Sequence, residues 1–561
     1  MLVSEKVEVY RDPFFGSPVA LDQPPKLVPQ QTRAVAEVLK ADGYRGFLLH
    51  GITGSGKTEV YLHIIAEKLR EGRGALVLIP EIALTPQLVH RFRARLGDQI
   101  AVLHSGLSDG ARYDQWRRIK RGELNVVIGA RSGVFAPIKD LGVIVVDEEH
   151  DPSFKQGDGV RYNARDMALV RGARDKVPVV LGSATPSLES TYNAQCGKLI
   201  RLSLPTRPTG GTLPGVELID LKTVGVPNDQ QRYLSRPIRD AITETLERGE
   251  QVIVFLNRRG FSSFVQCTGC GESLDCHQCA ISMTWHKRRR MLHCHYCDAV
   301  RPLPERCPSC NAPDLELLGR GTEKVEEKLA ALFPAARVRR LDRDTSGGRG
   351  LDRVLSGMRK REIDILIGTQ MVTKGHDFPY VTLVCVLDAD AGLRFPDFRA
   401  AERTIQLLTQ VAGRAGRADR PGRVLIQSWD PEQASLQTLR THDHAQFSQT
   451  ELQTRRCMGY PPFSHAAVIR VDGRNTAHVE RAMQIFAGEL KGARQGMAGI
   501  QVRGPSPAAL ERIRNRTRWA MLVTAEKRAD LRRLLDALSL EDSERPNDLR
   551  VIVDVDPYDL L

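Results

Sequence analysis

Residues 47–58 read FLLHGITGSGKT, and this stretch decides the fold of the first half of the chain. A strand-like apolar run, 47–50, leads into GITGSGKT, which fits the phosphate-binding pattern G-x-x-x-x-G-K-[ST] and opens a helical segment. The glycines allow backbone N–H groups to surround phosphate oxygens at the positive end of a helix. We expect Lys57 to reach the β- and γ-phosphates and the Thr58 hydroxyl to bind Mg²⁺. The predicted nucleotide-binding residues of this loop are Gly51, Gly54, Ser55, Gly56, Lys57 and Thr58.

Apolar runs alternate with amphipathic helical segments on either side of this stretch. Such runs occur at 75–79, 126–128, 143–146 and 179–181, and in a second series at 252–256, 363–367, 383–387 and 423–427. This βαβ alternation predicts an α/β protein with two doubly wound parallel sheets. After about residue 440 the pattern changes to that of an α+β domain.

The composition favours a polyanionic partner. The chain has 561 residues and a net charge of +13, and nucleic acid is the first candidate, although charge alone fits a merely basic protein equally well. No stretch approaches the roughly 20 apolar residues of a membrane span, and the first residues contain no apolar secretory core. A cytoplasmic location is therefore expected.

A second group of nucleotide-site residues follows the apolar run 143–146. Asp147 is expected to hold the Mg²⁺ shell, and Glu148 to orient and deprotonate the attacking water. Gln31 precedes the phosphate-binding loop, and its amide can read adenine through paired donor and acceptor groups. The alternative for Gln31 is a solvent-facing side chain.

Two further motifs narrow the class of ATPase. GSATP at 182–186 follows an apolar run, and QVAGRAGR at 410–417 lies in the second series. Arg414 and Arg417 are three residues apart, on one helical face, and suit an arginine finger that contacts the γ-phosphate. A basic surface helix is the alternative.

These motifs together resemble those of superfamily 2 helicases, and the PriA helicase family is the closer match. The stretches that carry this resemblance are 54–61, 78–87, 129–132, 147–150, 255–260 and 368–377. The resemblance implies two RecA-like lobes and a 3′→5′ DNA helicase that binds and remodels abandoned replication forks. It also implies primosome assembly, with single-strand-binding protein, primosome proteins and the loader of the replicative helicase as partners.

The start of the chain departs from the family pattern, because members usually carry a DNA-end-binding domain and a winged helix before the motor. Here the expected motor begins near residue 23, so recognition of the DNA end at a fork is the family function that this chain is not expected to share with certainty. The expected domains are a short N-terminal segment (1–22, at most a winged-helix remnant), an ATP-binding lobe (23–205), a linker (206–235), a second lobe (236–438) with a Cys-rich insertion (266–312), and a C-terminal domain (439–561).

The segment 151–166 mixes aromatic residues, cations and glycines, and resembles the family's aromatic-rich loop. Phe154 and Tyr162 can stack on bases, whereas Lys155, Arg161 and Arg165 can hold phosphates. A purely structural loop is the alternative. Three further residues at the ends of expected β-strands should contact the DNA sugar–phosphate backbone without regard to base sequence: Arg131, Thr369 and Lys374.

Eight of the eleven cysteines lie within 267–310, as four C-x-x-C pairs. Four pairs suit two tetrahedral Cys₄ zinc sites of the structural kind, with redox pairs or an iron–sulfur cluster as alternatives. The spacing alone permits three ways of combining the pairs. The resemblance implies nesting, with Cys267, Cys270, Cys307 and Cys310 on one zinc and Cys276, Cys279, Cys294 and Cys297 on the other.

The arginine-rich stretch 512–519 suits a carboxylate-terminated apolar peptide, and in the family this region contacts DNA and the acidic tail of single-strand-binding protein. A plain solvated strand fits nearly as well. Two rival functions remain open: a translocase that remodels DNA or protein without separating strands, and a zinc-stabilised scaffold that binds forks with its ATPase dispensable.

Overall fold

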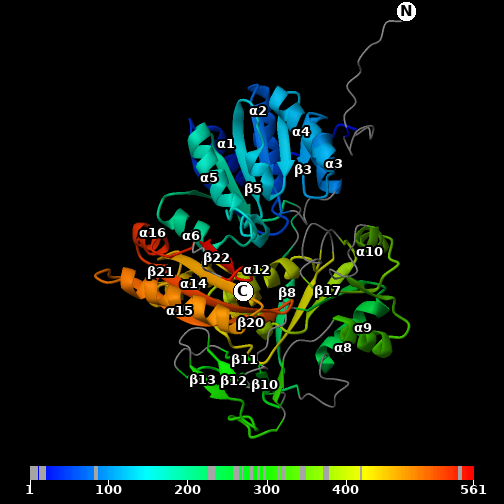
Figure 1. Cartoon of the computed structure of the whole chain (residues 1–561). Helices are drawn as coiled ribbons and strands as arrows, with labels where there is room; N and C mark the ends of the chain where they lie inside the picture. The colour runs from blue at the N-terminus through cyan, green and yellow to red at the C-terminus, as the bar shows by residue number, and fades with distance from the viewer. Residues whose placement is uncertain are drawn as a thin grey trace, which may run out of the picture. The chain divides into compact units, whose positions relative to one another are not determined.

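The computed structural model forms two compact units, Met1–Thr212 and Leu213–Leu561, called unit 1 and unit 2 below (Figure 1). The structure describes residues 11, 20–80, 86–208, 210, 212–224, 234–256, 265–267, 269–277, 282–286, 291–294, 299–313, 315–317, 322–341, 349–369, 378–416, 420–540 and 546–560. Within these residues, no helix has the length and apolar character needed to cross a membrane.

Unit 1 is built on a seven-stranded parallel sheet of order β3-β4-β2-β5-β6-β1-β7. Its strands are β1 (Gly46–Gly51), β2 (Gly74–Leu78), β3 (Ile100–Leu103), β4 (Val126–Gly129), β5 (Leu141–Asp147), β6 (Val179–Ser183) and β7 (Ile200–Leu204). The helices are α1 (Pro29–Leu39), α2 (Lys57–Arg70), α3 (Pro86–Leu96), α4 (Asp109–Arg121), α5 (Ala164–Asp175) and α6 (Leu188–Gln195). One face of the sheet packs on α1, α2 and α3, and the other on α4 and α5, so the sheet is doubly wound.

Unit 2 contains a second parallel sheet of six strands, in the order β15-β16-β9-β17-β18-β8. These strands are β8 (Gly215–Asp220), β9 (Gln251–Phe255), β15 (Val338–Leu341), β16 (Ile365–Gly368), β17 (Val381–Val386) and β18 (Arg423–Ser428). One face packs on α8 (Arg236–Glu247) and α9 (Thr322–Leu332). The other packs on α10 (Arg349–Arg359), α12 (Ala400–Ala412), α13 (Ala434–Arg440) and α14 (His444–Met458).

The Cys-rich segment lies between β9 and α9 and forms two small antiparallel sheets. One sheet pairs β10 (Val265–Cys267) with β14 (Leu315–Leu317), and the other joins β11 (Thr284–His286), β12 (Met291–His293) and β13 (Val300–Pro302). Strands of only three residues bury little apolar surface, so such a segment depends on staples for its stability.

The C-terminal part of unit 2 is a four-stranded antiparallel sheet of order β20-β21-β19-β22. The strands are β19 (His465–Gly473), β20 (Ile500–Ile513), β21 (Arg516–Ala525) and β22 (Arg550–Val555), and α15 (Thr476–Ala493) and α16 (Arg528–Asp536) cover one face. The predicted fold class is confirmed: two parallel-sheet lobes, a Cys-rich insertion in the second, and an α+β domain at the end.

The expected linker, 206–235, differs from the structure at one point. Residues 215–220 form β8, an edge strand of the second sheet that pairs with β18. The second lobe therefore begins before residue 236, because a short edge strand gives too weak an apolar pattern to be distinguished from a connector. The other expected domain bounds stay predictions.

Candidate functional site

The phosphate-binding loop joins the end of β1 to the first turn of α2. Gly54 and Gly56 have φ values of 82° and 80°, a left-handed conformation that favours glycine. A Cβ built on Gly56 would overlap the side-chain amide nitrogen of Gln31. The glycine pattern is therefore required both by the turn and by the close approach of α1.

Gln31 and Lys57 both contact the backbone of this loop. The Gln31 amide nitrogen donates to the Ser55 carbonyl at 2.9 Å, and its amide oxygen accepts from the Val28 N–H at 3.0 Å. At 3% exposure, Gln31 is not the solvent-facing residue considered as the alternative. Lys57 Nζ donates to the Gly51 carbonyl at 3.1 Å, which places its charge at the loop. The adenine contact of Gln31 stays a prediction.

Asp147 and Glu148 form an acidic pair at the end of β5. Burial, followed by the charge of Glu148, raises the pKa of Asp147, while Lys57 opposes the shift. Glu148 itself has a φ of 49°, an uncommon conformation for a residue with a side chain. A divalent cation would relieve the repulsion between two adjacent carboxylates, so the residues present fit the Mg²⁺ that phosphoryl transfer uses.

Glu149 and His150 connect this strand end to the segment that follows β6. The buried Glu149 carboxylate accepts from the Ser187 backbone N–H at 2.6 Å and from the Ser190 hydroxyl at 2.8 Å. His150 Nδ1 lies 2.7 Å from the Ser183 hydroxyl. Sequence reasoning assigned Glu149 no role, and its position beside a strand end was the available signal.

Two predicted DNA-contacting residues, Phe154 and Arg165, are buried in this conformation. Phe154 is 1% exposed and belongs to the core between the sheet and α5, so its ring has no free face for a base. Arg165 is 8% exposed, and its guanidinium pairs with Glu149 at 3.3 Å and Asp166 at 2.8 Å. A buried arginine that already faces two carboxylates has a structural function.

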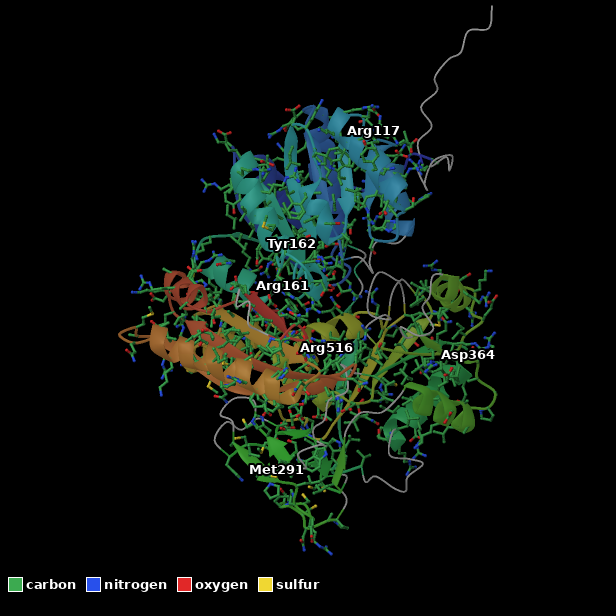
Figure 2. All side chains as sticks on the ribbon, viewed as in Figure 1. Arg117, Arg161, Tyr162, Met291, Asp364 and Arg516 are labelled. Carbon is green, nitrogen blue, oxygen red and sulfur yellow. The ribbon has the colours of Figure 1, made fainter. Side chains whose placement is uncertain are left out.

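The rest of the predicted DNA-contacting loop forms a short turn on the surface of unit 1. An isolated bridge pairs Lys155 with Asn163, and the Gln156 N–H donates to the Tyr162 carbonyl at 2.8 Å. Tyr162 packs edge-on against Phe135 with ring centroids 5.1 Å apart. Figure 2 places Arg161 and Tyr162 far from Arg117 of α4, near one another at one end of unit 1.

Arg131 donates hydrogen bonds to two backbone carbonyls at the start of that turn. Its Nη1 donates to the Ser153 carbonyl at 3.3 Å and to the Lys155 carbonyl at 2.9 Å. The structure therefore brings two predicted DNA-contacting residues, Arg131 and Lys155, into direct contact, and Tyr162 lies across the same turn, opposite Gln156. Their contacts with DNA stay predictions.

In unit 2, Arg414 lies just after α12 and is partly buried, and Thr369 directly follows β16. Arg417 and Lys374 lie outside the described residues. The start of α12 is tied to α14, because Arg455 pairs with Glu402 at 2.8 Å. This ion pair anchors the helix that leads to Arg414.

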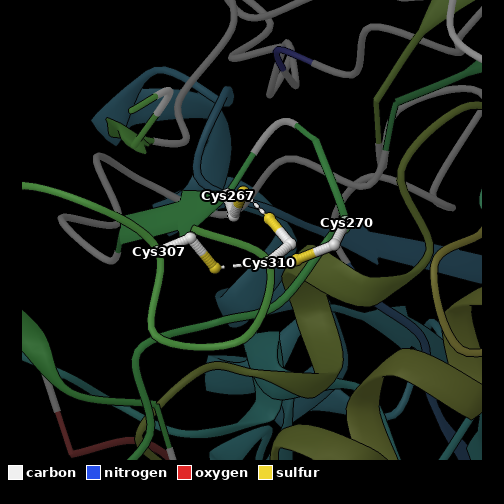
Figure 3. Close-up of side chains that lie close together, drawn as sticks. All are labelled: Cys267, Cys270, Cys307 and Cys310. Atoms are coloured by element: carbon white, nitrogen blue, oxygen red, sulfur yellow. Dashed lines mark hydrogen bonds between the residues drawn. The ribbon is translucent and has the colours of Figure 1, made fainter. Parts of the chain in front are cut away.

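Four cysteine sulfurs converge on the loop after β10 (Figure 3). The Sγ atoms of Cys267, Cys270, Cys307 and Cys310 all lie within 4.8 Å of one another, with Cys267–Cys310 at 3.5 Å and Cys270–Cys307 at 3.7 Å. Tetrahedral thiolates at the zinc–sulfur bond length would lie about 3.8 Å apart, so the four sulfurs fit zinc. The Gly269 N–H donates to Cys267 Sγ at 3.3 Å, as expected for a thiolate ligand.

The other predicted zinc site is described only in part. Cys276 and Cys294 are buried in the small core of the insertion, while Cys279 and Cys297 lie outside the described residues. The first site also contacts the second lobe, because Arg394 Nη1 donates to the Gly271 carbonyl at 3.0 Å. A Cβ on Gly271 would lie 2.6 Å from Trp429 Cγ, so glycine allows the indole to pack there.

The arginine-rich stretch 512–519 spans the turn between β20 and β21. Arg514 and Asn515 have φ values of 49° and 61° and form the tight turn. Arg516 pairs with Asp472, and Trp519 is 7% exposed in the core under α15. The aromatic ring expected beside the arginines is therefore buried.

Four family models match separate stretches of the chain. The DEAD/DEAH box helicase family matches residues 28–194, and the helicase conserved C-terminal domain matches 318–419. The PriA DNA helicase Cys-rich region matches 276–302, and the primosomal protein N C-terminal domain matches 456–558.

Similar curated proteins share one name. The replication restart protein PriA of Bacillus subtilis is 44% identical over 558 residues, which are 98% of this chain and 69% of that protein. PriA of Haemophilus influenzae is 42% identical over 95% of this chain and 72% of its own length. PriA of Treponema pallidum is 40% identical over 95% of this chain and 80% of its own length. A solved structure of RecG bound to a three-way DNA junction aligns with 77% of this chain and 47% of that chain, at 18% identity and a TM-score of 0.46.

Proposed function

Since the chain belongs to the PriA family of replication restart proteins, we propose that it couples ATP hydrolysis to 3′→5′ movement on DNA at stalled or abandoned forks. It is a replication restart DNA helicase with ATPase activity, and it uses nucleotide and zinc. The observation that carries the ATPase is the phosphate-binding loop, whose lysine lies in the same unit as the half-buried acid pair at the end of β5.

Hydrolysis requires positioning and charge neutralisation, and residues of both lobes supply them in this proposal. Lys57 and the loop amides bind the phosphates, Asp147 and Thr58 hold Mg²⁺, and Glu148 orients the attacking water. Arg414 and Arg417 neutralise charge on the γ-phosphate. Mg²⁺, when bound, supplies positive charge for the bond that breaks.

Zinc supplies structure rather than chemistry. Four thiolates leave no position open for water, so zinc acts as a cross-link that closes the loops between the C-x-x-C pairs. We place one ion on Cys267, Cys270, Cys307 and Cys310, and a second on Cys276, Cys279, Cys294 and Cys297. The first cross-link fixes the loop that Arg394 and Trp429 contact.

DNA contacts in this proposal come from Arg131, Lys155, Arg161 and Tyr162 in the first lobe and from Thr369 and Lys374 in the second. Cations and a ring at the turn after β5 suit single-stranded DNA, which binds by phosphate contacts and stacking without regard to sequence. Partners at the fork are single-strand-binding protein, primosome proteins and the loader of the replicative helicase. The site of action is the cytoplasm.

Two rivals are distinguished by a strand-separation assay together with an assay of fork binding and loader recruitment. Strand separation is measured on partial duplexes with a 3′ or a 5′ single-stranded tail, with Mg²⁺–ATP and Lys57→Ala as the control. Separation of the 3′-tailed substrate only, lost in the control, is the expected result. Hydrolysis without separation on either substrate would favour the translocase, and fork binding with loader recruitment that survives Lys57→Ala would favour the scaffold.

A further inference from the structure

Tyr61 lies on α2 one helical turn after Lys57 and is buried, with 1% of its surface exposed. Its hydroxyl donates to Asp147 Oδ1 at 3.0 Å. A buried tyrosine hydroxyl needs a polar partner, and here that partner is the carboxylate assigned above to the cation. The bond joins the helix that begins at the phosphate-binding lysine to the acidic end of β5.

Gly182 provides the space for this hydroxyl. Asp147 and Gly182 are register partners on β5 and β6. A Cβ built on Gly182 would overlap the Tyr61 hydroxyl oxygen and lie 2.7 Å from Tyr61 Cζ. The backbone cannot shift freely, because the Gly182 carbonyl accepts from the Glu149 N–H at 3.0 Å. Residue 182, the first of the GSATP motif, must therefore be glycine because a side chain there would collide with Tyr61 of α2.

The Tyr61 hydroxyl acts as the donor in this bond, because an ionised carboxylate can only accept. A donor held on Oδ1 restricts rotation of the Asp147 carboxylate. Phenylalanine at this position would keep the ring packing and remove only the donor.

We propose that Tyr61 is a positioning residue for ATP hydrolysis: its hydroxyl, housed by the missing side chain of Gly182, holds the Asp147 carboxylate in the orientation that magnesium–nucleotide binding needs. This inference rests on the proposed role of Asp147. In this proposal Tyr61 of α2 and Gly182 of β6 both serve to orient Asp147 of β5.

The test measures how strongly Mg²⁺ tightens nucleotide binding in the full chain. Binding of a fluorescent ATP analogue is titrated with Mg²⁺ and again with EDTA, for wild type and Tyr61→Phe. Without Mg²⁺ the two proteins should bind alike. With Mg²⁺ the tightening should be smaller in the variant by on the order of tenfold, the loss expected when a hydrogen bond to a charged group is removed. Tyr44→Phe, at a partly exposed tyrosine of the same lobe, is the matched control and should behave as wild type.

A second variant tests the steric part. Gly182→Ala should also reduce the tightening of nucleotide binding by Mg²⁺. In the double variant with Tyr61→Phe, the total reduction should be smaller than the sum of the two single reductions, because the oxygen that overlaps the new methyl group is gone. Strictly additive effects would overturn the steric claim.

Asp147→Asn separates the two levels of inference: if it abolishes the tightening while Tyr61→Phe retains it in full, Tyr61 has no positioning role. If Asp147→Asn itself retains the tightening, the proposed function of Asp147 fails and the inference falls with it.

Discussion

Glu149 accepts a hydrogen bond from the backbone N–H of Ser187 at 2.6 Å, and this bond ties the acidic end of β5 to the start of α6. The same carboxylate is fully buried and accepts from the hydroxyls of Ser187 and Ser190 and from Arg165 Nη1. A buried anion surrounded by donors is stable only while its charge and all its acceptor sites remain. Glu149 is thus the structural member of the acidic motif.

Glu149→Gln should destabilise unit 1. The amide would present hydrogens to groups that are themselves donors, and Arg165 would lose its buried counter-charge. We expect the urea transition of unit 1 to lose about 3 kcal/mol of unfolding free energy. Glu37→Gln is the matched control, because its pair with Lys40 is exposed and should contribute almost nothing. A urea transition of Glu149→Gln that coincides with that of the control would refute this role.

Phe154→Ala should act on stability rather than on DNA binding. Its ring is buried in the core against α5, and removing a buried phenylalanine costs about 3–5 kcal/mol. Thermal unfolding measures this loss, with Val160→Ala as the control in the same loop, since Val160 is 84% exposed. If Phe154→Ala unfolded at the wild-type temperature and lost only the stimulation of its ATPase by DNA, the ring would have to leave the core to contact DNA.

The burial of Phe154 and Arg165, two predicted DNA-contacting residues, shows where sequence reasoning stops. The nucleotide loop could be predicted because its chemistry is local: glycine spacing, lysine and helix start all lie within 51–58. Aromatic and basic residues in 151–166 have the same pattern whether they face solvent or the core. The burial of Phe154 and Arg165 depends on how α5 packs on the sheet, which the local sequence does not encode.

Contacts between distant elements were also beyond prediction. The Tyr61–Asp147 bond joins residues 86 positions apart and requires α2 to pack over the end of β5, an arrangement that no motif specifies. The grouping of Cys267 and Cys270 with Cys307 and Cys310 likewise came from a family resemblance, because spacing allowed three combinations. The structure brings these four together, and their zinc content stays a prediction.

Removal of one cysteine should remove one zinc ion. Cys310→Ala leaves three thiolates at the first site, which should lower the bound zinc by one ion per chain, measured by mass spectrometry of the native protein. Cys457→Ala is the control, because Cys457 is exposed and lies outside the insertion. Equal zinc content in both variants would show that Cys310 is not a ligand.

His50 makes the stability of unit 1 depend on pH. It lies near the end of β1, where burial, then the charges of Arg201 and Lys57, lower the pKa of its imidazole to about 4. In the unfolded chain the ordinary pKa of about 6.5 applies, so the unfolded state binds more protons between these two values. The loss of unfolding free energy caused by His50 is therefore absent above pH 6.5, grows as the pH falls toward 4, and is constant below pH 4.

His50→Gln should flatten this part of the pH profile of stability. The wild type should lose about 3 kcal/mol of unfolding free energy from this residue between pH 6.5 and 4, since each pKa unit corresponds to about 1.4 kcal/mol. The measurement compares urea transitions of wild type and variant at several pH values, so that contributions from other groups cancel in the difference. His90→Gln, at an exposed histidine of α3, should leave the profile as steep as in the wild type. An equally steep profile for His50→Gln would mean that His50 is charged in the folded protein, and the assignment of a partly buried, neutral imidazole near Lys57 would be wrong.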